Sequence, residues 1–201
     1  MQYLTNHLKR AHLIAAILFL STGFSWAAEY TIDPTHSNAI FKVKHLGIST
    51  VTGKFDTFSG SFEFDQQHVG IAKAAAAIAT ASINTGVEKR DEHLRSADFF
   101  DAAKFPQISF VSKEITDVQG NTFKVHGDLT MHSITQPVVL DATLGGVVKD
   151  PWGNERAAFT ASTALNRKEF GLTYAQALET GGLLVGEEVQ ILLEIEGILK
   201  K

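Results

Sequence analysis

The chain is 201 residues long, carries a formal net charge of −4 at pH 7 and contains no cysteine. Without cysteine it can form no disulfide, thiolate zinc site or cysteine nucleophile. The acidic balance argues against a nucleic-acid or anionic-membrane partner, because basic patches are what hold such partners. The length fits one domain that is large enough to bury a core of its own.

The N-terminus has the three parts of a secretory signal peptide. Lys9 and Arg10 form a basic region, residues 13–20 (LIAAILFL) an apolar one, and Ser25-Trp26-Ala27 a small-residue cleavage site. An uncleaved membrane anchor is the alternative, but the apolar run is short for a spanning helix. We therefore expect a signal peptide over residues 1–27, a mature domain over residues 28–201 with no membrane-spanning segment, and a periplasmic or secreted location.

Apolar and polar residues alternate along most of the mature chain. Phe62 and Phe64, for example, alternate with Ser61 and Glu63. A period of two over many segments predicts antiparallel sheet with one buried face, and the turn spacing indicates a barrel or sandwich. The clearest strands are expected at Ala39–Leu46, Gly60–Asp65, Asn121–Leu129, Gln136–Leu144 and Glu187–Ile195.

The alanine-rich run Ala72–Ala81 has high helix propensity when taken alone. Its place among alternating strands favours a strand, with Ala74, Ala76, Ile78 and Thr80 facing inward. Small inward residues leave space that Leu or Phe would fill, so this run favours a hollow barrel over a solid core.

One short helix is expected over Glu88–Ser96, with Asp98–Ala103 as a second turn. Thr85 is the expected N-cap, with Glu88 three residues later as its capping-box partner. A helix across one end of a barrel would place its charged residues near the rim.

Metal and catalytic motifs are absent from the sequence. The mature chain has six histidines and none forms an HxH or HxxxH pair, so no metal site is expected. No nucleophile elbow or phosphate-binding glycine loop is present, so no catalytic residue is expected either. His45 lies on the same predicted face as Phe41 and Val43, where it is either a hydrogen-bonded core residue or a polar anchor inside a cavity.

The stretch from Arg90 to Phe110 is charged in its first part and aromatic in its second. Such a segment can close the mouth of an apolar cavity. The charged residues Arg90, Asp91, His93 and Arg95 have two readings. They either form an internally paired network worth little per exposed pair, or they bind the polar head of a ligand through an arginine fork.

The sequence resembles the YceI family of exported, lipocalin-like polyisoprenoid-binding proteins. The resemblance runs through the whole mature chain and is most specific in its central block, residues 90–100 (RDEHLRSADFF) followed by 105–110 (FPQISF). The other matching stretches are residues 30–33, 36–37, 41–47, 53–60, 127–130, 135–138, 150–153, 156, 170–171 and 185–189. The Ala74–Ala77 run departs from the family pattern, in which β-branched residues are more usual.

The resemblance implies an all-β fold, namely an extended eight-stranded antiparallel barrel with a short helix near one end. It also implies a deep apolar tunnel for a polyisoprenoid, an isoprenoid quinone or another long-chain amphiphile. No cofactor beyond this ligand is expected. An inner-membrane protein partner and a homodimer both stay open.

The sequence therefore predicts a periplasmic carrier or sequestering protein that performs no catalytic step. The tail of the ligand is expected to contact Phe41, Val43, Phe55, Phe58, Phe62, Phe99, Phe105, Phe110 and Phe170. Its polar head is expected to meet His45, Arg90 and His93. Two alternatives stay open: an enzyme acting on a lipid headgroup through Arg90, Asp91 and His93, and an interaction module with a filled core.

Overall fold

The structure is a computed structural model that describes residues 27–65, 71–179 and 181–201. The expected signal peptide up to Trp26, His68 and most of the turn at 65–70 lie outside the described residues. The strands are β1 (Ala28–Ile32), β2 (Asn38–His45), β3 (Ser49–Phe55), β4 (Phe58–Phe64), β5 (Ile71–Ala79), β6 (Ile83–Asn84), β7 (Gln107–Gln119), β8 (Thr122–Met131), β9 (Ile134–Lys149), β10 (Glu155–Asn166) and β11 (Val185–Leu199). The helical elements are η1 (Thr80–Ser82), α1 (Glu88–Arg95) and η2 (Arg167–Phe170).

Eight strands form a closed antiparallel barrel, in the order β1-β4-β5-β7-β8-β9-β10-β11. The ring closes where β1 pairs with the end of β11, with Tyr30 opposite Leu199 and Ile32 opposite Gly197. Closure gives these strands partners on both sides and removes free sheet edges. The expected barrel with one short helix is therefore confirmed.

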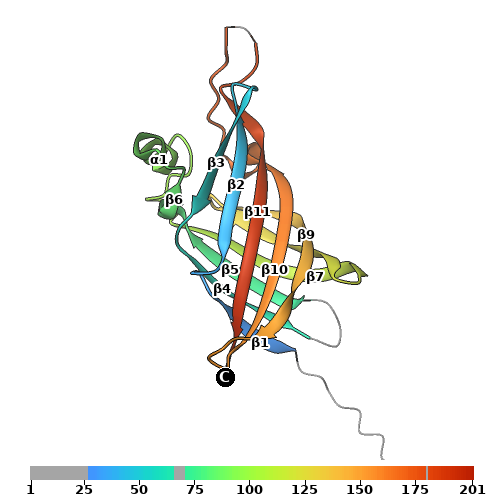
Figure 1. The fold of residues 1–201 in the computed structure, drawn as a ribbon. Coiled ribbons are helices and arrows are strands. Elements are labelled where there is room, and N and C mark those ends of the chain that lie inside the picture. The colour runs from blue at the N-terminus through green and yellow to red at the C-terminus, as the bar shows by residue number, and fades with distance from the viewer. Residues whose placement is uncertain (1–26, 66–70, 180) are drawn as a thin grey trace, which may run out of the picture.

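The remaining strands extend the wall at one end. β11 is 15 residues long, and its first part, Val185–Glu194, pairs with β2 before its last part reaches β1. β3 pairs with β2, and β6 pairs with the end of β3. In Figure 1 these strands rise towards the end where the β10–β11 connection lies, which we call the upper end.

The alanine-rich run forms strand β5, as predicted, although the strand ends at Ala79 and Thr80 begins the 3₁₀ turn η1. Ala76 and Ile78 line the barrel cavity, and Ala74 packs against the core below it. Thr80 is buried at 1% exposure within the turn. Tertiary pairing with β4 and β7 thus overrides the helix propensity of alanine.

The expected helix is present, begins at Glu88 as predicted and ends at Arg95, one residue before the expected end, but its capping differs. α1 follows Val87, which makes no side-chain capping bond, so the predicted Thr85–Glu88 capping box is wrong. Instead the Thr85 amide and hydroxyl donate to Asp91 Oδ1 at 2.9 and 2.5 Å. Residues 98–103 form turns and no second helical segment. A buried acceptor on the helix therefore holds the preceding loop, the reverse of the predicted capping arrangement.

The lower half of the barrel is filled by an aromatic plug, which we define as Tyr30, Phe62, Phe64, Phe123 and Phe159. All five are at most 5% exposed. The Tyr30 and Phe62 rings are stacked with centroids 5.2 Å apart, and Phe159 meets Phe62, Phe64 and Phe123 edge-on. Such ring pairs stabilise a core beyond their buried area alone.

Among the described residues no helix is long and apolar enough to cross a membrane.

Candidate ligand-binding site

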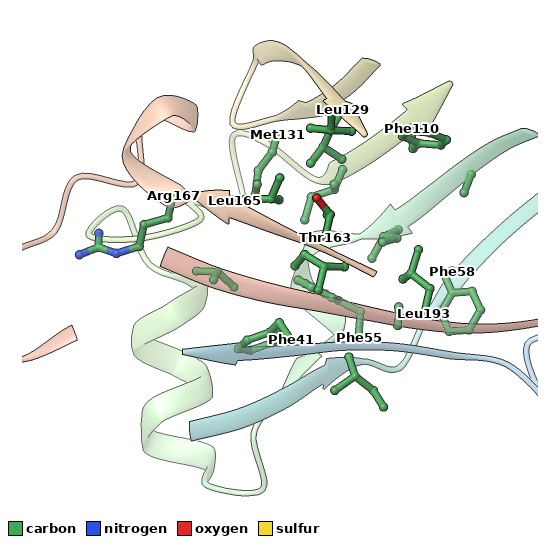
Figure 2. Close-up of a pocket in the computed structure, with 18 of the residues that line it drawn as sticks. Phe41, Phe55, Phe58, Phe110, Leu129, Met131, Thr163, Leu165, Arg167 and Leu193 are labelled. Carbon is green, nitrogen blue, oxygen red and sulfur yellow. The ribbon is translucent and has the colours of Figure 1, made fainter. Parts of the chain in front are cut away.

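A narrow cavity of about 210 Å³ runs through the upper part of the barrel (Figure 2). Of its 27 lining residues, 25 are apolar, and Thr163 and Arg167 are the two exceptions. Along β11 the lining extends from Val185 to Ile195, which is roughly 33 Å of strand at about 3.3 Å per residue. The lining residues are Ile32, Ala39, Ile40, Phe41, Val43, Phe55, Phe58, Ala76, Ile78, Leu94, Phe99, Phe100, Ile108, Phe110, Leu129, Met131, Val138, Leu140, Thr163, Leu165, Arg167, Leu172, Val185, Val189, Ile191, Leu193 and Ile195.

Six of the nine residues expected to wall the tunnel line this cavity, namely Phe41, Val43, Phe55, Phe58, Phe99 and Phe110. The Phe41 ring packs beside Phe55 at 5.9 Å and over Gly53 on the neighbouring strand. A Cβ at Gly53 would lie 2.3 Å from the ring, so only glycine leaves the room that this ring needs. Their contact with a ligand stays a prediction, and their position is suited to it.

The other three phenylalanines lie elsewhere. Phe62 belongs to the aromatic plug, below the cavity. Phe170 is 1% exposed and packs in a second cluster with Ile108 and Met131, behind the lining. Phe105 lies against the His132 ring, with centroids 4.1 Å apart. Each is aromatic and at least partly buried, but their burial comes from solid packing.

The segment between β6 and β7 covers the upper end of the cavity. Leu94 of α1, with Phe99 and Phe100 after it, contributes to the lining. Tyr174, from the β10–β11 connection, lies over Phe99 with ring centroids 4.6 Å apart. The aromatic half of this segment therefore lies where an element that closes the cavity would have to lie. Its role as a closing element stays a prediction.

The charged half of the segment does not line the cavity. Arg90 Nε donates to Thr85 Oγ1 at 2.7 Å and Arg90 Nη2 to the Thr85 carbonyl oxygen at 2.9 Å. His93 Nε2 lies 2.8 Å from Asp98 Oδ2, and its ring packs edge-on against Phe99 and Tyr174 from outside. These contacts support the reading of an internally paired network. The interaction of Arg90 and His93 with a ligand head stays a prediction. Neither side chain is among the residues that line the cavity.

His45 is also absent from the lining. It ends β2, is half-buried, and lies opposite Ser49 on β3 and Val185 on β11. Period-two alternation placed it on the face of Val43, but the hairpin turn begins at the next residue. It therefore lies above the cavity, at the end of the strand.

Two polar lining residues were missed from the sequence. Arg167 is 5% exposed, and its three guanidinium nitrogens donate to the carbonyl oxygens of Gly186, Leu172 and Val185. Burial lowers the pKa of Arg167, while the nearby Glu187 carboxylate acts in the opposite direction. In Figure 2 its guanidinium points away from the other lining side chains, so its stem borders the cavity. The signal in the sequence that could have identified Arg167 is its position as a charged residue directly after a strand with an alternating pattern.

Thr163 is the second, and lies within β10 between the inward positions of Ala161 and Leu165. Figure 2 shows its hydroxyl among apolar lining side chains. Continuing the alternation along β10 would have placed it inward, although nothing in the sequence distinguishes it from a packing residue.

An ionic cluster lies on the outer face near the lower end. Asp33, His36 and Glu196 offer ligand atoms within 4.8 Å of one another. Arg156 Nη1 already lies 2.8 Å from Asp33 and 2.5 Å from Glu196, and its Nε lies 2.9 Å from Asp150. The guanidinium thus already occupies the carboxylate oxygens that would hold a cation and offsets part of their charge, and the arrangement is an ion-pair network.

This network shifts the pKa values of its members. Hydrogen bonds from the Thr35 hydroxyl, His36 and Arg156 hold the pKa of Asp33 well below its usual range, against the opposing effect of burial. Burial raises the pKa of Asp150, but hydrogen bonds from Arg156 and Asn154 outweigh it and bring the pKa to about 2. The two aspartates and Arg156 therefore stay ionised throughout the neutral range.

A closed antiparallel barrel with an apolar cavity inside it defines the class of small barrels that can hold a ligand. A family model described as a YceI-like domain matches residues 30–197, and the chain belongs to this family. Protein YceI of Salmonella arizonae is 38% identical over 190 residues, covering 94% of this chain and 95% of that protein. A UPF0312 protein of Pseudomonas putida is 38% identical over 193 residues, covering 95% and 97%.

Solved structures share the fold. The YceI protein of Campylobacter jejuni matches with a TM-score of 0.69 and 32% identity, over 79% of this chain and 90% of that one. A domain from Saccharophagus degradans, described as a polyisoprenoid binding domain implicated in plant cell wall breakdown, matches with a TM-score of 0.63 over 87% of this chain and 99% of its own. At 16% identity the second likeness shows the fold alone.

Proposed function

We propose that this protein binds a long-chain isoprenoid lipid, a polyisoprenoid or an isoprenoid quinone, inside the barrel and carries, stores or sequesters it in the periplasm. The observation that carries the proposal is the narrow cavity with 25 apolar lining residues out of 27. Each CH₂ group moved from water into such a site contributes about 0.8 kcal/mol. A tail of several isoprene units therefore gains enough to offset the cost of ordering it.

The description of the Saccharophagus degradans domain as polyisoprenoid-binding supports the same class of ligand. Entry is proposed at the upper end, between Phe99 and Tyr174. There the cavity is covered by connecting segments, which open more easily than paired strands. Residues 1–27, the segment with the pattern of a signal peptide, would direct export and then be removed.

The two alternatives fit the geometry less well. An enzyme using Arg90, Asp91 and His93 needs these groups at the ligand, and none of them lines the cavity. An interaction module with a filled core needs an interior without a cavity of this volume. The carrier proposal accounts for both the cavity and the paired charges outside it.

A matched pair of variants tests the proposal. Leu193 lines the cavity and packs against the core, whereas its neighbour Leu192, on the opposite face of β11, is not among the lining residues. Each is replaced by Gln, and binding of a prenyl quinone is measured by native mass spectrometry after folding has been checked by circular dichroism. We expect Leu193→Gln to lose the bound quinone and Leu192→Gln to keep it. Equal binding by both folded variants would contradict a ligand inside the barrel.

A further inference from the structure

Thr163 carries a hydroxyl group in a cavity whose other lining side chains offer a ligand no polar atom. Arg167, the other polar lining residue, uses its three nitrogens on the carbonyl oxygens of Gly186, Leu172 and Val185. Its guanidinium also points away from the lining side chains in Figure 2. Thr163 is therefore the one described lining residue whose side chain presents a hydrogen-bonding atom to the interior.

The register of β10 fixes the direction of this hydroxyl-bearing side chain. Thr163 lies opposite Ile191 on β11, and both line the cavity. The ladder between β10 and β9 ends at Ser162, opposite Asp141, so Thr163 lies just past the end of that pairing. Residues on either side of Thr163 along the inward face, Ala161 and Leu165, are apolar.

No side-chain hydrogen bond is found for Thr163 within the described ranges 27–65, 71–179 and 181–201. Thr163 is half-buried and borders the cavity, so a ligand that fills the cavity would enclose its hydroxyl. Enclosing a hydroxyl is costly unless the ligand supplies a hydrogen-bond partner. Valine is similar in size and has no hydroxyl, so it would avoid this cost in a purely apolar wall. A ligand oxygen at this depth would provide the partner.

We infer that Thr163 is the residue that selects the ligand of the proposed carrier, by hydrogen-bonding an uncharged oxygen inside the tunnel. The inference rests on the proposed function and narrows its ligand to a prenyl lipid whose hydroxyl or carbonyl oxygen is enclosed by the barrel. An ionised head, such as a phosphate, is excluded from this depth. No cation faces the cavity among the described residues, and an unpaired charge is not stable in an apolar interior.

Three probes that share the farnesyl skeleton test this: farnesol with a neutral oxygen, farnesene with none, and farnesyl phosphate with an ionised head. Their affinities are measured by displacement of the neutral dye N-phenyl-1-naphthylamine from the wild type, Thr163→Val and Thr160→Val. Thr160 is an exposed residue on the outer face of the same strand and serves as the matched control.

We expect Thr163→Val to weaken farnesol roughly two- to tenfold, the range of one neutral hydrogen bond. Farnesene should be unchanged because it has no oxygen, and farnesyl phosphate should be unchanged because its head stays in water at the upper end. Thr160→Val should change none of the three. An equal loss for all probes, or an unchanged farnesol affinity, would overturn the role of Thr163 while leaving the carrier proposal intact. Failure of the wild type to bind any probe would overturn both.

Discussion

The ring of Phe62 lies directly against Gly197, where a Cβ atom would come within 2.6 Å of it. Gly197 is the next inward position on β11 after Ile195, the last lining residue of that strand. The contact therefore joins β4 to β11 just below the cavity, and we expect the Phe62 ring to act as the floor that closes the cavity from beneath. The rest of the aromatic plug supports the ring from beneath.

The floor should limit the length of the tail that the barrel accepts. Phe62→Leu removes part of the ring and extends the space downward, so we expect longer prenyl chains to bind relatively better than in the wild type. Stability should fall by about 1 to 3 kcal/mol, because the change leaves a cavity in a packed core. Affinity is measured across a ladder of prenyl alcohols of increasing length.

Phe64→Leu is the matched control, since Phe64 lies in the same plug two residues farther along β4 and is equally buried. Its loss opens a void that stays separated from the cavity by Phe62. An identical length preference in the two variants would contradict the assignment of Phe62 as the floor.

Tyr174 should slow the exchange of ligand. Its ring covers Phe99 at 4.6 Å and meets His93 at 5.3 Å, so Tyr174→Ala uncovers the upper end. We expect dissociation of a bound neutral dye to become faster by roughly tenfold, the equivalent of about 1.4 kcal/mol, with little change in melting temperature. Stopped-flow fluorescence measures the rate. Trp152→Ala, which removes an aromatic residue that is 80% exposed outside the cavity lining, should leave the rate unchanged.

Arg167 holds both ends of the β10–β11 connection, through Leu172 at its start and Val185 and Gly186 at its end. Arg167→Met keeps much of the stem but leaves these carbonyl oxygens without their donor. We expect a loss of about 3 kcal/mol in the free energy of unfolding, measured with urea. Arg95→Met removes an exposed pair with Glu88 and should cost less than about 1 kcal/mol. Equal losses in the free energy of unfolding of the two variants would show that Arg167 does not hold the β10–β11 connection in place.

The ion-pair network should make the barrel sensitive to acid. A carboxyl group whose pKa is lower in the folded chain binds fewer protons there than in the unfolded chain. Its contribution to stability is therefore complete above the unfolded pKa of about 3.9 and is lost as the pH falls through its folded pKa, which for Asp150 is about 2. Asp33 acts in the same direction.

We therefore expect a melting temperature that is flat between about pH 5 and 7 and falls steeply below about pH 4. Arg156→Met removes the shared donor of Asp33 and Asp150, so its melting temperature should be lower at neutral pH and fall less steeply in acid. Differential scanning calorimetry from pH 2 to 7 measures both curves. If the melting temperatures of the wild type and Arg156→Met fell with the same slope below pH 4, Arg156 would not be the residue that lowers these pKa values.

Alternation along the strands was sufficient to predict the inward faces, and it placed Ala76, Phe41 and Val43 correctly on the inside. It could not indicate depth along the barrel axis. Phe58 and Phe62 share one face of β4, yet Phe58 lines the cavity and Phe62 packs in the aromatic plug below it. The difference arises from Gly197, which reaches Phe62 only through the closure of β1 on β11.

The polar residues were harder to assign for a related reason. Arg90 looked like a ligand-binding cation because the sequence shows its charge but not its partners. Thr85, only five residues earlier, accepts two of its hydrogen bonds. Thr163 looked like any β-branched strand residue, and its importance appears only when every neighbour in the lining is known to be apolar.

The most direct test of the carrier account is to purify the protein from its native host, extract it with organic solvent and analyse the extract by mass spectrometry. We expect a prenyl-chain lipid in about stoichiometric amount, with an uncharged, oxygen-bearing head. An empty extract that stays empty after incubation with added prenyl quinone would contradict it.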